Sequence, residues 1–369
     1  MRIFLTGALA VALAGGSAGV ATAADEIPTV RTDDLPITAF QEDPADTTAD
    51  PAPEDAGDQS SEDSNQDDAE ETKPKKPNAT EVPVGYQISP GASGKYGVGQ
   101  LVTINFDKPI ARRSSVEDAI TVTSNRKKKL SKGAWGWIDR QTAIYRPKKF
   151  WPGDARITFD VDLKNVLLGV EGKTHYVGAK NREYVLRTDR KMVIKIRDAK
   201  HRLYVYRENK LIKSFPVSLG KVEGGYKTRS GIKILTGEQY VKLRMIGTDR
   251  LTGEDWDVIS PYSIRLTPTG EFIHGAPWAY SRIGLANGSH GCTNMRVADA
   301  KWLFHRVMRG DPTITTGTGR PMEVTNGTPG AYWNYSWKKW LQKSATKGKQ
   351  SSSQDKDNES QDKDTGKQN

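Results

Sequence analysis

Hydrophobic and polar residues alternate in short runs through most of residues 81–325, and Gly, Pro, Asn, Asp or Lys separate one run from the next. Clear examples are 101–106 (LVTINF), 156–161 (RITFDV), 192–196 (MVIKI) and 202–206 (RLYVY). Alternation with a period of two buries one face of an extended strand and leaves the other exposed. The pattern therefore predicts a mainly β protein.

The strand runs fall into two folded modules. Residues 81–188 have the length and turn spacing of an immunoglobulin-like β-sandwich, a fold of about 100 residues. Residues 189–325 continue the β pattern and contain one helical stripe at 297–309, where apolar residues recur at i, i+3, i+4, i+7 and i+8. Residues 326–342 hold three tryptophans at helical spacing, and we expect them to pack back onto the second module.

The stretch 247–268 interrupts the strand pattern of the second module. It is polar and rich in turn residues, and it comes directly before the strand that carries His274. A stretch of this length with little periodicity inside a compact domain is usually functional. We predict a lid over a site at that strand, with Tyr262 or Trp256 touching the bound substrate.

Residues 1–24 have the features of a secretory signal peptide. Arg2 provides the positive start, 3–13 form an apolar run, and 21–23 provide a small-residue cleavage site. This interpretation predicts a secreted protein in the extracytoplasmic cell wall; an uncleaved N-terminal anchor at the membrane is the alternative. Residues 25–80 and 343–369 bury too little apolar surface to offset the entropy of ordering, which predicts a disordered acidic spacer and a disordered tail.

The charge of the chain is divided unevenly along its length. Residues 25–72 carry 17 acidic side chains and one arginine, whereas residues from 73 onward carry 53 basic and 28 acidic side chains, a net +25. In an exported protein, such a basic body suggests contact with anionic wall polymers or a membrane surface. No nucleic-acid-binding motif accompanies it. A generic soluble surface is the alternative, because the basic residues are scattered.

The candidate chemistry is concentrated in residues 272–296 (FIHGAPWAYSRIGLANGSHGCTNMR). This stretch holds the single cysteine of the chain, Cys292, and two of its five histidines, His274 and His290. The small polar neighbours of Cys292 favour a reactive thiol over one that fills an apolar gap. A zinc site is the poorer interpretation, because one Cys and two His lack a fourth ligand at metal spacing. We therefore expect no metal and no cofactor.

A thiol attacks a carbonyl efficiently when an imidazole accepts its proton and nearby donors hold the oxyanion. Either His274 or His290 meets the first need on the sequence alone. The backbone amides of Gly291, Cys292 and Thr293 are natural oxyanion donors, because glycine before the thiol lets the backbone approach a substrate closely. A backbone carbonyl can orient the imidazole.

The motifs 274–278 (HGAPW) and 287–294 (NGSHGCTN) resemble the signature of the L,D-transpeptidase (YkuD-like) family. The likeness is to the actinobacterial members with an immunoglobulin-like domain before the catalytic domain. It extends to 96–99 (YGVG) and 135–137 (WGW) in the first module and to 228–231 (TRSG) and 309–311 (RGD) in the second.

The resemblance implies that Cys292 attacks the meso-diaminopimelyl–D-Ala bond of a peptidoglycan tetrapeptide stem, releases D-Ala and forms a thioester. An amine of a neighbouring stem would then give a 3→3 cross-link. Two alternatives stay open: water as the acceptor, which would make an L,D-carboxypeptidase, and a wall-binding scaffold without catalysis. Covalent inactivation by carbapenem β-lactams is a further expectation.

The resemblance also implies roles for individual residues. It makes His274 the general base and the backbone carbonyl of Gly275 its orienting group, and it assigns the oxyanion hole to amides near Gly291–Thr293. Three further positions match residues that line the site in the family: Ser289, His290 and Asn294. Gly275, Gly288, Thr293 and Asn294 depart from the residues that relatives usually have, which affects the expected substrate preference more than the expected activity.

Overall fold

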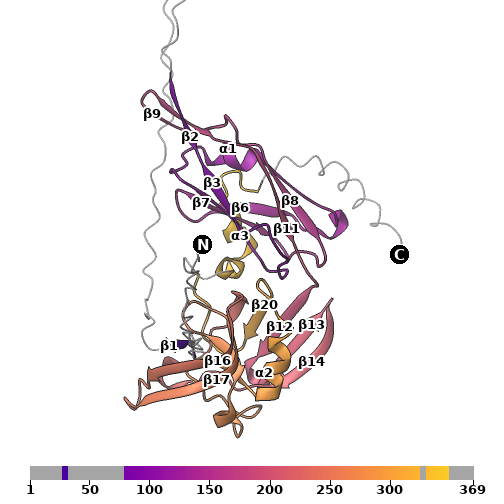
Figure 1. The fold of residues 1–369 in the computed structure, drawn as a ribbon, viewed down its shortest axis with the longest axis vertical. Helices are drawn as coiled ribbons and strands as arrows, with labels where there is room; N and C mark the ends of the chain where they lie inside the picture. The colour runs from indigo at the N-terminus through magenta and orange to yellow at the C-terminus, as the bar shows by residue number, and fades with distance from the viewer. Residues whose placement is uncertain (1–26, 32–78, 325–329, 349–369) are drawn as a thin grey trace, which may run out of the picture.

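The protein consists of two β modules joined end to end, with a C-terminal segment beside their junction (Figure 1). This computed structural model describes residues 27–31, 79–324 and 330–348. The expected signal peptide, most of the spacer and residues 349–369 of the tail lie outside the described residues. Among the described residues, no helix has the length and hydropathy needed to cross a bilayer.

The first module is a β-sandwich-like unit whose strands form three sheets, ordered β3-β4-β7-β6, β11-β8-β5 and β2-β10-β9. Its core is contiguous and aromatic, and Trp135, Trp151 and Phe159 are almost fully buried in it. Its elements are β2 (Thr80–Val84), β3 (Tyr86–Ser89), β4 (Val102–Phe106), α1 (Arg113–Asp118), β5 (Ile120–Ser124), η1 (Lys127–Lys129), β6 (Gly133–Trp137), β7 (Thr142–Pro147), β8 (Arg156–Val161), β9 (Leu167–Glu171), β10 (Thr174–Gly178) and β11 (Arg182–Arg187).

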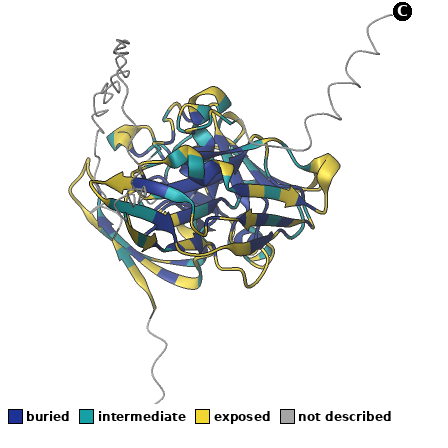
Figure 2. Cartoon of the chain, turned by 90° about the horizontal axis from the view of Figure 1, so that it is seen from above, coloured by how far each residue is buried: buried dark blue, intermediate teal, exposed yellow. Residues whose placement is uncertain are grey.

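The second module contains two five-stranded sheets, ordered β14-β13-β12-β20-β15 and β1-β16-β17-β18-β19. Buried Val, Ile, Leu and Met side chains fill the space between these sheets and helix α2. Over the described part of the chain, buried residues gather in the interior and exposed residues on the outer loops (Figure 2). Its elements are β12 (Met192–Arg197), η2 (Asp198–Lys200), β13 (Arg202–Arg207), β14 (Lys210–Pro216), η3 (Glu223–Gly225), β15 (Gly231–Ile234), β16 (Gln239–Thr248), β17 (Asp255–Arg265), β18 (Phe272–Gly275), η4 (Pro277–Ala279), β19 (Thr293–Met295), α2 (Val297–Phe304) and β20 (Pro312–Thr316). The prediction of a mainly β protein with one principal helix is confirmed.

Helix α2 ends earlier than the hydrophobic stripe predicts, at Phe304 rather than 309. Beyond it, the Arg306 carbonyl accepts a hydrogen bond from the Arg190 guanidinium, and the Met308 amide donates to the Asp311 carboxylate (3.0 Å). These partners satisfy backbone groups that a longer helix would have paired internally. Val307 stays buried although it lies beyond the end of the helix.

The predicted spacer is wrong at residues 27–31. Strand β1 (Thr29–Arg31) pairs in parallel with β16, with Val30 opposite Met245. Val30 packs against a cluster that contains Leu243 and Phe272, which attaches this short strand to the edge of the sheet.

The C-terminal residues also differ from prediction. The Trp-rich segment, η5 (Ala331–Asn334) and α3 (Trp337–Leu341), packs between the modules rather than onto the second module alone. The indoles of Trp333 and Trp340 donate to carbonyls of the first module, Gly99 (2.8 Å) and Ala134 (3.1 Å). Residues 344–346 of the predicted tail are held against the first module, because the buried Glu117 carboxylate accepts hydrogen bonds from them.

Candidate active site

Strands β18 and β19 bring the predicted residues together. They pair in parallel with His274 opposite Asn294 and Ile273 opposite Thr293. Residues in register, and residues two apart on one strand, share a face. His274, Cys292 and Asn294 therefore face one cavity, whereas Ile273 on the opposite face packs in the core of the module.

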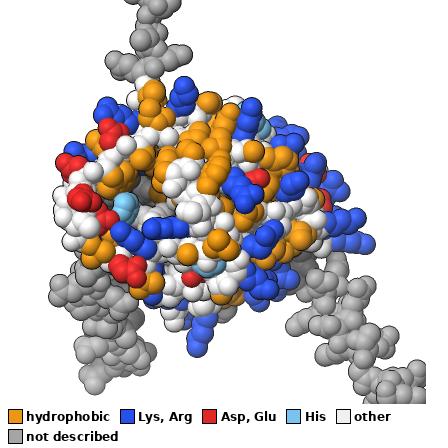
Figure 3. Space-filling view, turned by 90° about the horizontal axis from the view of Figure 1, so that it is seen from below, with side chains coloured by type: hydrophobic (Ala, Val, Ile, Leu, Met, Phe, Trp, Pro, Cys, Tyr) orange, Lys and Arg blue, Asp and Glu red, His pale blue; other side chains and the backbone are white. Residues whose placement is uncertain are grey.

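The cavity has a volume of about 450 Å³. Its base holds Cys292 and His274, and its walls come from the β16–β17 hairpin and from residues 225–229 and 278–291. In the space-filling view of Figure 3, blue Lys and Arg side chains are spread among hydrophobic ones over the face shown. Among the described residues, no group of His, Cys, Asp and Glu is arranged to hold a metal ion.

His274 is buried at the end of β18, and its Nδ1 lies 3.0 Å from the Gly275 carbonyl oxygen. A carbonyl only accepts hydrogen bonds, so the neutral ring carries its proton on Nδ1 and leaves Nε2 free to accept another. Burial lowers the pKa of His274 to about 4, and the Gly275 carbonyl opposes part of that shift. The imidazole is therefore a neutral base at neutral pH.

Cys292 precedes β19 and is partly exposed to the cavity. Its Sγ lies 3.7 Å from the Gly270 carbonyl oxygen, to which the thiol donates. Burial raises the pKa of the thiol to about 12; a backbone hydrogen bond from Phe272 opposes the shift, and the charge of Glu271 adds to it. Since the resting group is a thiol, attack on a substrate requires His274 to take its proton during the same step.

The buried imidazole predicts an unusual pH profile. The rate of Cys292 acylation should stay level on acidification from pH 8 and fall only near pH 4, because an exposed imidazole would protonate near 6.5 but His274 does not. The free energy of unfolding should decrease as the pH falls from about 6.5 to about 4, since in that window the unfolded imidazole binds a proton that the folded one does not. Stopped-flow acylation rates from pH 3.5 to 8, with fluorescence to verify folding, provide the measurement. A half-maximal rate near pH 6.5 would contradict the assignment.

The loop before the thiol is held by its own hydrogen bonds. Ser289 is buried; its hydroxyl donates to the Cys292 carbonyl (2.6 Å) and accepts from the Gly291 amide (3.1 Å). Thr228 anchors the loop from outside by donating to the Gly291 carbonyl (2.8 Å). The Gly291 amide, predicted as an oxyanion donor, is thus engaged within the loop. The amides of Cys292 and Thr293 stay predictions.

The predicted lid is a β-hairpin and not an irregular loop. Strands β16 and β17 pair along their length, and only residues 249–254 form its tip. Met245, Trp256 and Val258 face the cavity. The hairpin projects from the module, so the polar residues that alternate with Trp256 and Val258 in β17 are exposed. Its composition therefore resembles that of a loop.

His290 joins the hairpin tip to the catalytic loop. Its Nε2 lies 2.8 Å from the Asp249 carboxylate, and the Trp256 ring stacks on it with centroids 5.2 Å apart. The Lys221 ammonium lies 2.7 Å from the Asp249 carboxylate and is the main cause that lowers the pKa of Asp249, followed by hydrogen bonds from the Leu251 amide and His290. His290 thus lines the site, as predicted, but the carboxylate that holds it comes from 41 residues away and no local motif indicates it.

The prediction for Tyr262 is wrong. Its backbone is left-handed (φ 53°), and its ring packs against Phe304 of helix α2 with centroids 5.6 Å apart. Tyr262 belongs to the packing around the core of the module rather than to the cavity wall. Trp256, its predicted companion, does line the cavity.

Four arginines in the cavity wall were not predicted as site residues. Arg229, Arg250, Arg282 and Arg320 come from four separate stretches of the chain, so no spacing in the sequence connects them. Glu271 is also part of the wall and directly precedes the His274 strand. An acidic side chain within an otherwise apolar run (GEFI) was the one local feature of the sequence that could have indicated Glu271 as a site residue.

A buried neutral imidazole, oriented by a carbonyl and facing a lone thiol in a β module, defines a cysteine-dependent catalytic domain. Comparison with known proteins gives the family. Residues 191–315 match the family described as "L,D-transpeptidase catalytic domain", and residues 55–167 match "Bacterial Ig domain". The chain belongs to the L,D-transpeptidase family, in the form with an immunoglobulin-like domain before the catalytic domain.

Two relatives from Mycobacterium tuberculosis illustrate the likeness. L,D-transpeptidase 2 is 31% identical over 272 residues, which is 70% of this chain and 62% of the relative. L,D-transpeptidase 5 is 29% identical over 266 residues, 71% of this chain and 56% of the relative. The chain thus aligns with less than two thirds of the length of these relatives.

Solved structures show the same fold. An L,D-transpeptidase from Mycobacterium smegmatis has a TM-score of 0.50 at 24% identity, covering 64% of this chain and 100% of that one. LD transpeptidase LdtMt1 in complex with imipenem has a TM-score of 0.50 at 23% identity, covering 63% of this chain and 99% of the other. At these identities the likeness concerns the fold alone.

Proposed function

We propose that this chain is a secreted L,D-transpeptidase that forms 3→3 cross-links between peptidoglycan stem peptides. The observation that carries the proposal is that one cavity is lined both by a protonated thiol, Cys292, and by a buried imidazole, His274, whose Nδ1 lies 3.0 Å from the Gly275 carbonyl oxygen. This pair suits acyl transfer, because the base is neutral and unprotonated at Nε2 when the substrate arrives.

The first half-reaction acylates the enzyme. The Cys292 sulfur attacks the carbonyl of the meso-diaminopimelyl–D-Ala bond while its proton passes to His274 Nε2. The tetrahedral intermediate collapses, the C–N bond breaks, and the imidazolium returns the proton to the leaving amine of D-Ala. The product is a thioester on Cys292, and the imidazole is neutral again.

The second half-reaction transfers the acyl group. An amine of a neighbouring stem attacks the thioester, gives its proton to His274, and expels the sulfur, which recovers that proton as the thiol. Burial of His274 supports both steps, since an imidazole with a pKa near 4 holds the proton only briefly.

The cavity offers specific contacts to a peptide. Asn294 is buried, and its Oδ1 has no hydrogen-bond partner among the described residues. A buried unpaired acceptor is costly, which suggests that a substrate N–H completes it. The hairpin wall of Met245, Trp256 and Val258 supplies apolar contact to the aliphatic part of a stem.

The acceptor decides between two activities of the same thioester. We expect purified protein, incubated with a disaccharide-tetrapeptide, to release D-Ala and yield a 3→3 dimer in mass spectrometry. A tripeptide product without dimer would make the chain an L,D-carboxypeptidase. A protein that binds the tetrapeptide and releases no D-Ala would support the non-catalytic wall-binding scaffold instead.

β-Lactams of the carbapenem class are proposed covalent inhibitors. Imipenem is present in the structure of the LdtMt1 relative, and the cavity here is large enough for a drug-sized ligand. We also propose that the protein works in the cell wall, where its basic body would favour anionic wall polymers. Expression in a wall-forming host and fractionation into wall, membrane and cytoplasm would test the location.

A further inference from the structure

The wall of the cavity is strongly basic. Arg229, Arg250, Arg282 and Arg320 line it, and Glu271 is the acidic residue in the lining. Glu271 is already neutralised, since the fully buried Lys233 ammonium lies 2.8 Å from its Oε2. The mechanism proposed above uses none of these groups.

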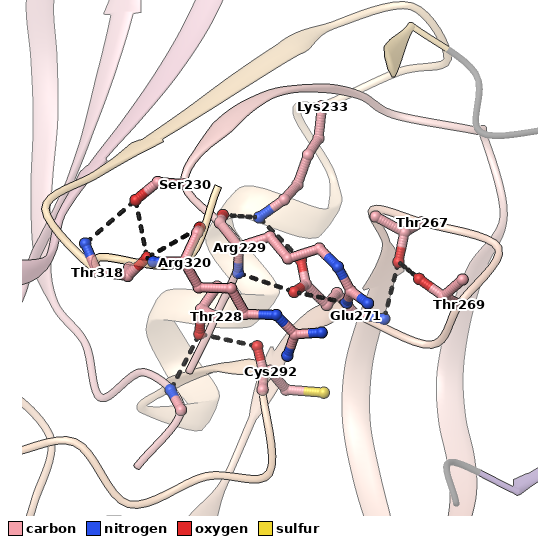
Figure 4. A network of polar contacts seen from close by, with 12 residues as sticks. Thr228, Arg229, Ser230, Lys233, Thr267, Thr269, Glu271, Cys292, Thr318 and Arg320 are labelled. Atoms are coloured by element: carbon pink, nitrogen blue, oxygen red, sulfur yellow. Dashed lines mark hydrogen bonds and ion pairs between the residues drawn. The ribbon is translucent and has the colours of Figure 1, made fainter. Parts of the chain in front are cut away.

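Arg229 and Arg320 are fixed in place rather than free on the surface. Arg229 is paired through Nε with the Glu323 carboxylate (2.6 Å) and through Nη1 with Glu271 (3.3 Å), and its side chain is 12% exposed. Arg320 donates through Nη1 to the carbonyls of Gly225 (3.1 Å) and Lys227 (3.3 Å). Figure 4 shows Arg229 with Glu271 and Lys233, and Arg320 beside them, near the Cys292 side chain.

The network carries excess positive charge. Three basic groups, Arg229, Lys233 and Arg320, face two carboxylates, Glu271 and Glu323, which leaves one positive charge uncompensated. Arg320 is the least compensated member, because its nearest carboxylate oxygen in Glu323 is 3.7 Å away and its Nη1 contacts are neutral carbonyls. An excess charge in a partly buried wall favours a bound anion, and a fixed pair of guanidinium groups suits a carboxylate.

We propose that Arg229 and Arg320 form a carboxylate subsite beside Cys292, which selects acyl-donor peptides with a free carboxylate over the same peptides with that group amidated. A single uncompensated charge matches a monoanion. A carboxamide in that position is neutral, so it cannot compensate the positive charge of Arg320. It also places an NH2 donor where the carboxylate has a second acceptor oxygen, and a guanidinium group can only donate. The assignment to a donor peptide rests on the proposed function.

The subsite can be tested independently of that function, because the chain contains one cysteine. Iodoacetate and iodoacetamide both alkylate Cys292: the sulfur displaces iodide, and the thiol proton goes to His274. The basic wall should favour the anionic reagent, and Arg320→Gln should lower the iodoacetate-to-iodoacetamide rate ratio by about 10-fold, the weight of one charge-assisted contact. Arg320→Lys should restore part of the ratio.

Controls separate charge from folding. Arg207→Gln makes the same charge change at an exposed position on β13, outside the cavity lining, and should leave the ratio unchanged. If Arg320→Gln does not fold, Arg229→Gln and the salt dependence of the wild-type ratio give the same information, since added salt should lower it. A wild-type ratio that does not respond to salt, or equal ratios in wild type and folded Arg variants, would overturn the subsite.

Matched donor peptides complete the test. The wild type should acylate from the free-carboxylate peptide about 10- to 100-fold faster than from its amide, and Arg320→Gln should reduce that preference. Equal acylation by both peptides would overturn the subsite while the proposed function stands. Acylation by neither peptide would overturn the proposed function, and with it the assignment to a donor peptide.

Discussion

Replacing Cys292 by alanine should abolish the covalent adduct with a carbapenem and lower D-Ala release by at least about 10³-fold. No other side chain can replace the nucleophile, because the chain has one cysteine, and it lines the same cavity as the sole buried histidine of the described residues. Intact-protein mass spectrometry shows the adduct directly, and amino-acid analysis measures D-Ala.

The variant should remain folded, since alanine differs from cysteine only by the sulfur, which faces a cavity. An unchanged unfolding midpoint is therefore the first control. His274→Gln should slow acylation by about 10²- to 10⁴-fold, because a thiol with a pKa of about 12 depends on a base. His305→Gln, at an exposed position after helix α2, is the matched control and should react as the wild type does. A persistent adduct in Cys292→Ala would exclude the thioester mechanism.

The sequence predicts the site where the chemistry is local and fails where it depends on distant segments. Cys292 and its two candidate bases, His274 and His290, lie in one stretch of 25 residues, so composition indicated the site, and the family resemblance favoured His274 as the base. The alignment of Cys292 with His274 follows from strand parity once β18 and β19 pair. Asp249 at the hairpin tip contacts His290, and Glu323 joins Arg320 to Arg229. These residues are far apart in the sequence, so no local pattern predicts either contact.

The fold was predictable to a similar extent. Alternation identified the strands with one buried and one exposed face. The β16–β17 hairpin was interpreted as an irregular lid because turn residues and acids dominate its tip. Asp255 and Asp257 nevertheless alternate with Trp256 and Val258, and that alternation was the available strand signal. Tyr262 was assigned to the site from its place in the turn-rich stretch alone, and sequence position did not indicate that its ring packs against Phe304 of helix α2.

Removing the Trp340 side chain should destabilise the whole folded body, because this indole closes the junction between the modules. Trp340 is fully buried, and its cluster contains Leu101 and Ile144 from the first module and Ile234 from the second. Trp340→Ala should lower the free energy of unfolding by about 3–5 kcal/mol, the range for losing a buried large aromatic side chain. Urea unfolding measured by fluorescence and circular dichroism gives the value.

The same variant should separate the unfolding of the two modules. Wild-type unfolding is expected to be one transition, since the shared cluster couples the cores, whereas Trp340→Ala should show two. Arg146 strengthens the coupling: it is buried beneath the indole, 5.6 Å from its centroid, and donates to the carbonyls of Tyr332 and Tyr335. The loss of Trp340 would therefore also admit water to this guanidinium.

Trp337→Ala provides the matched comparison on the same short helix. Trp337 is only half-buried, so its removal should cost clearly less than the removal of Trp340 and should leave a single transition. If both variants unfold alike, the C-terminal segment does not join the modules. If Trp340→Ala alone splits the transition and slows acylation at Cys292, the junction also supports the catalytic module, which would explain why a segment so far along the chain returns to the first module.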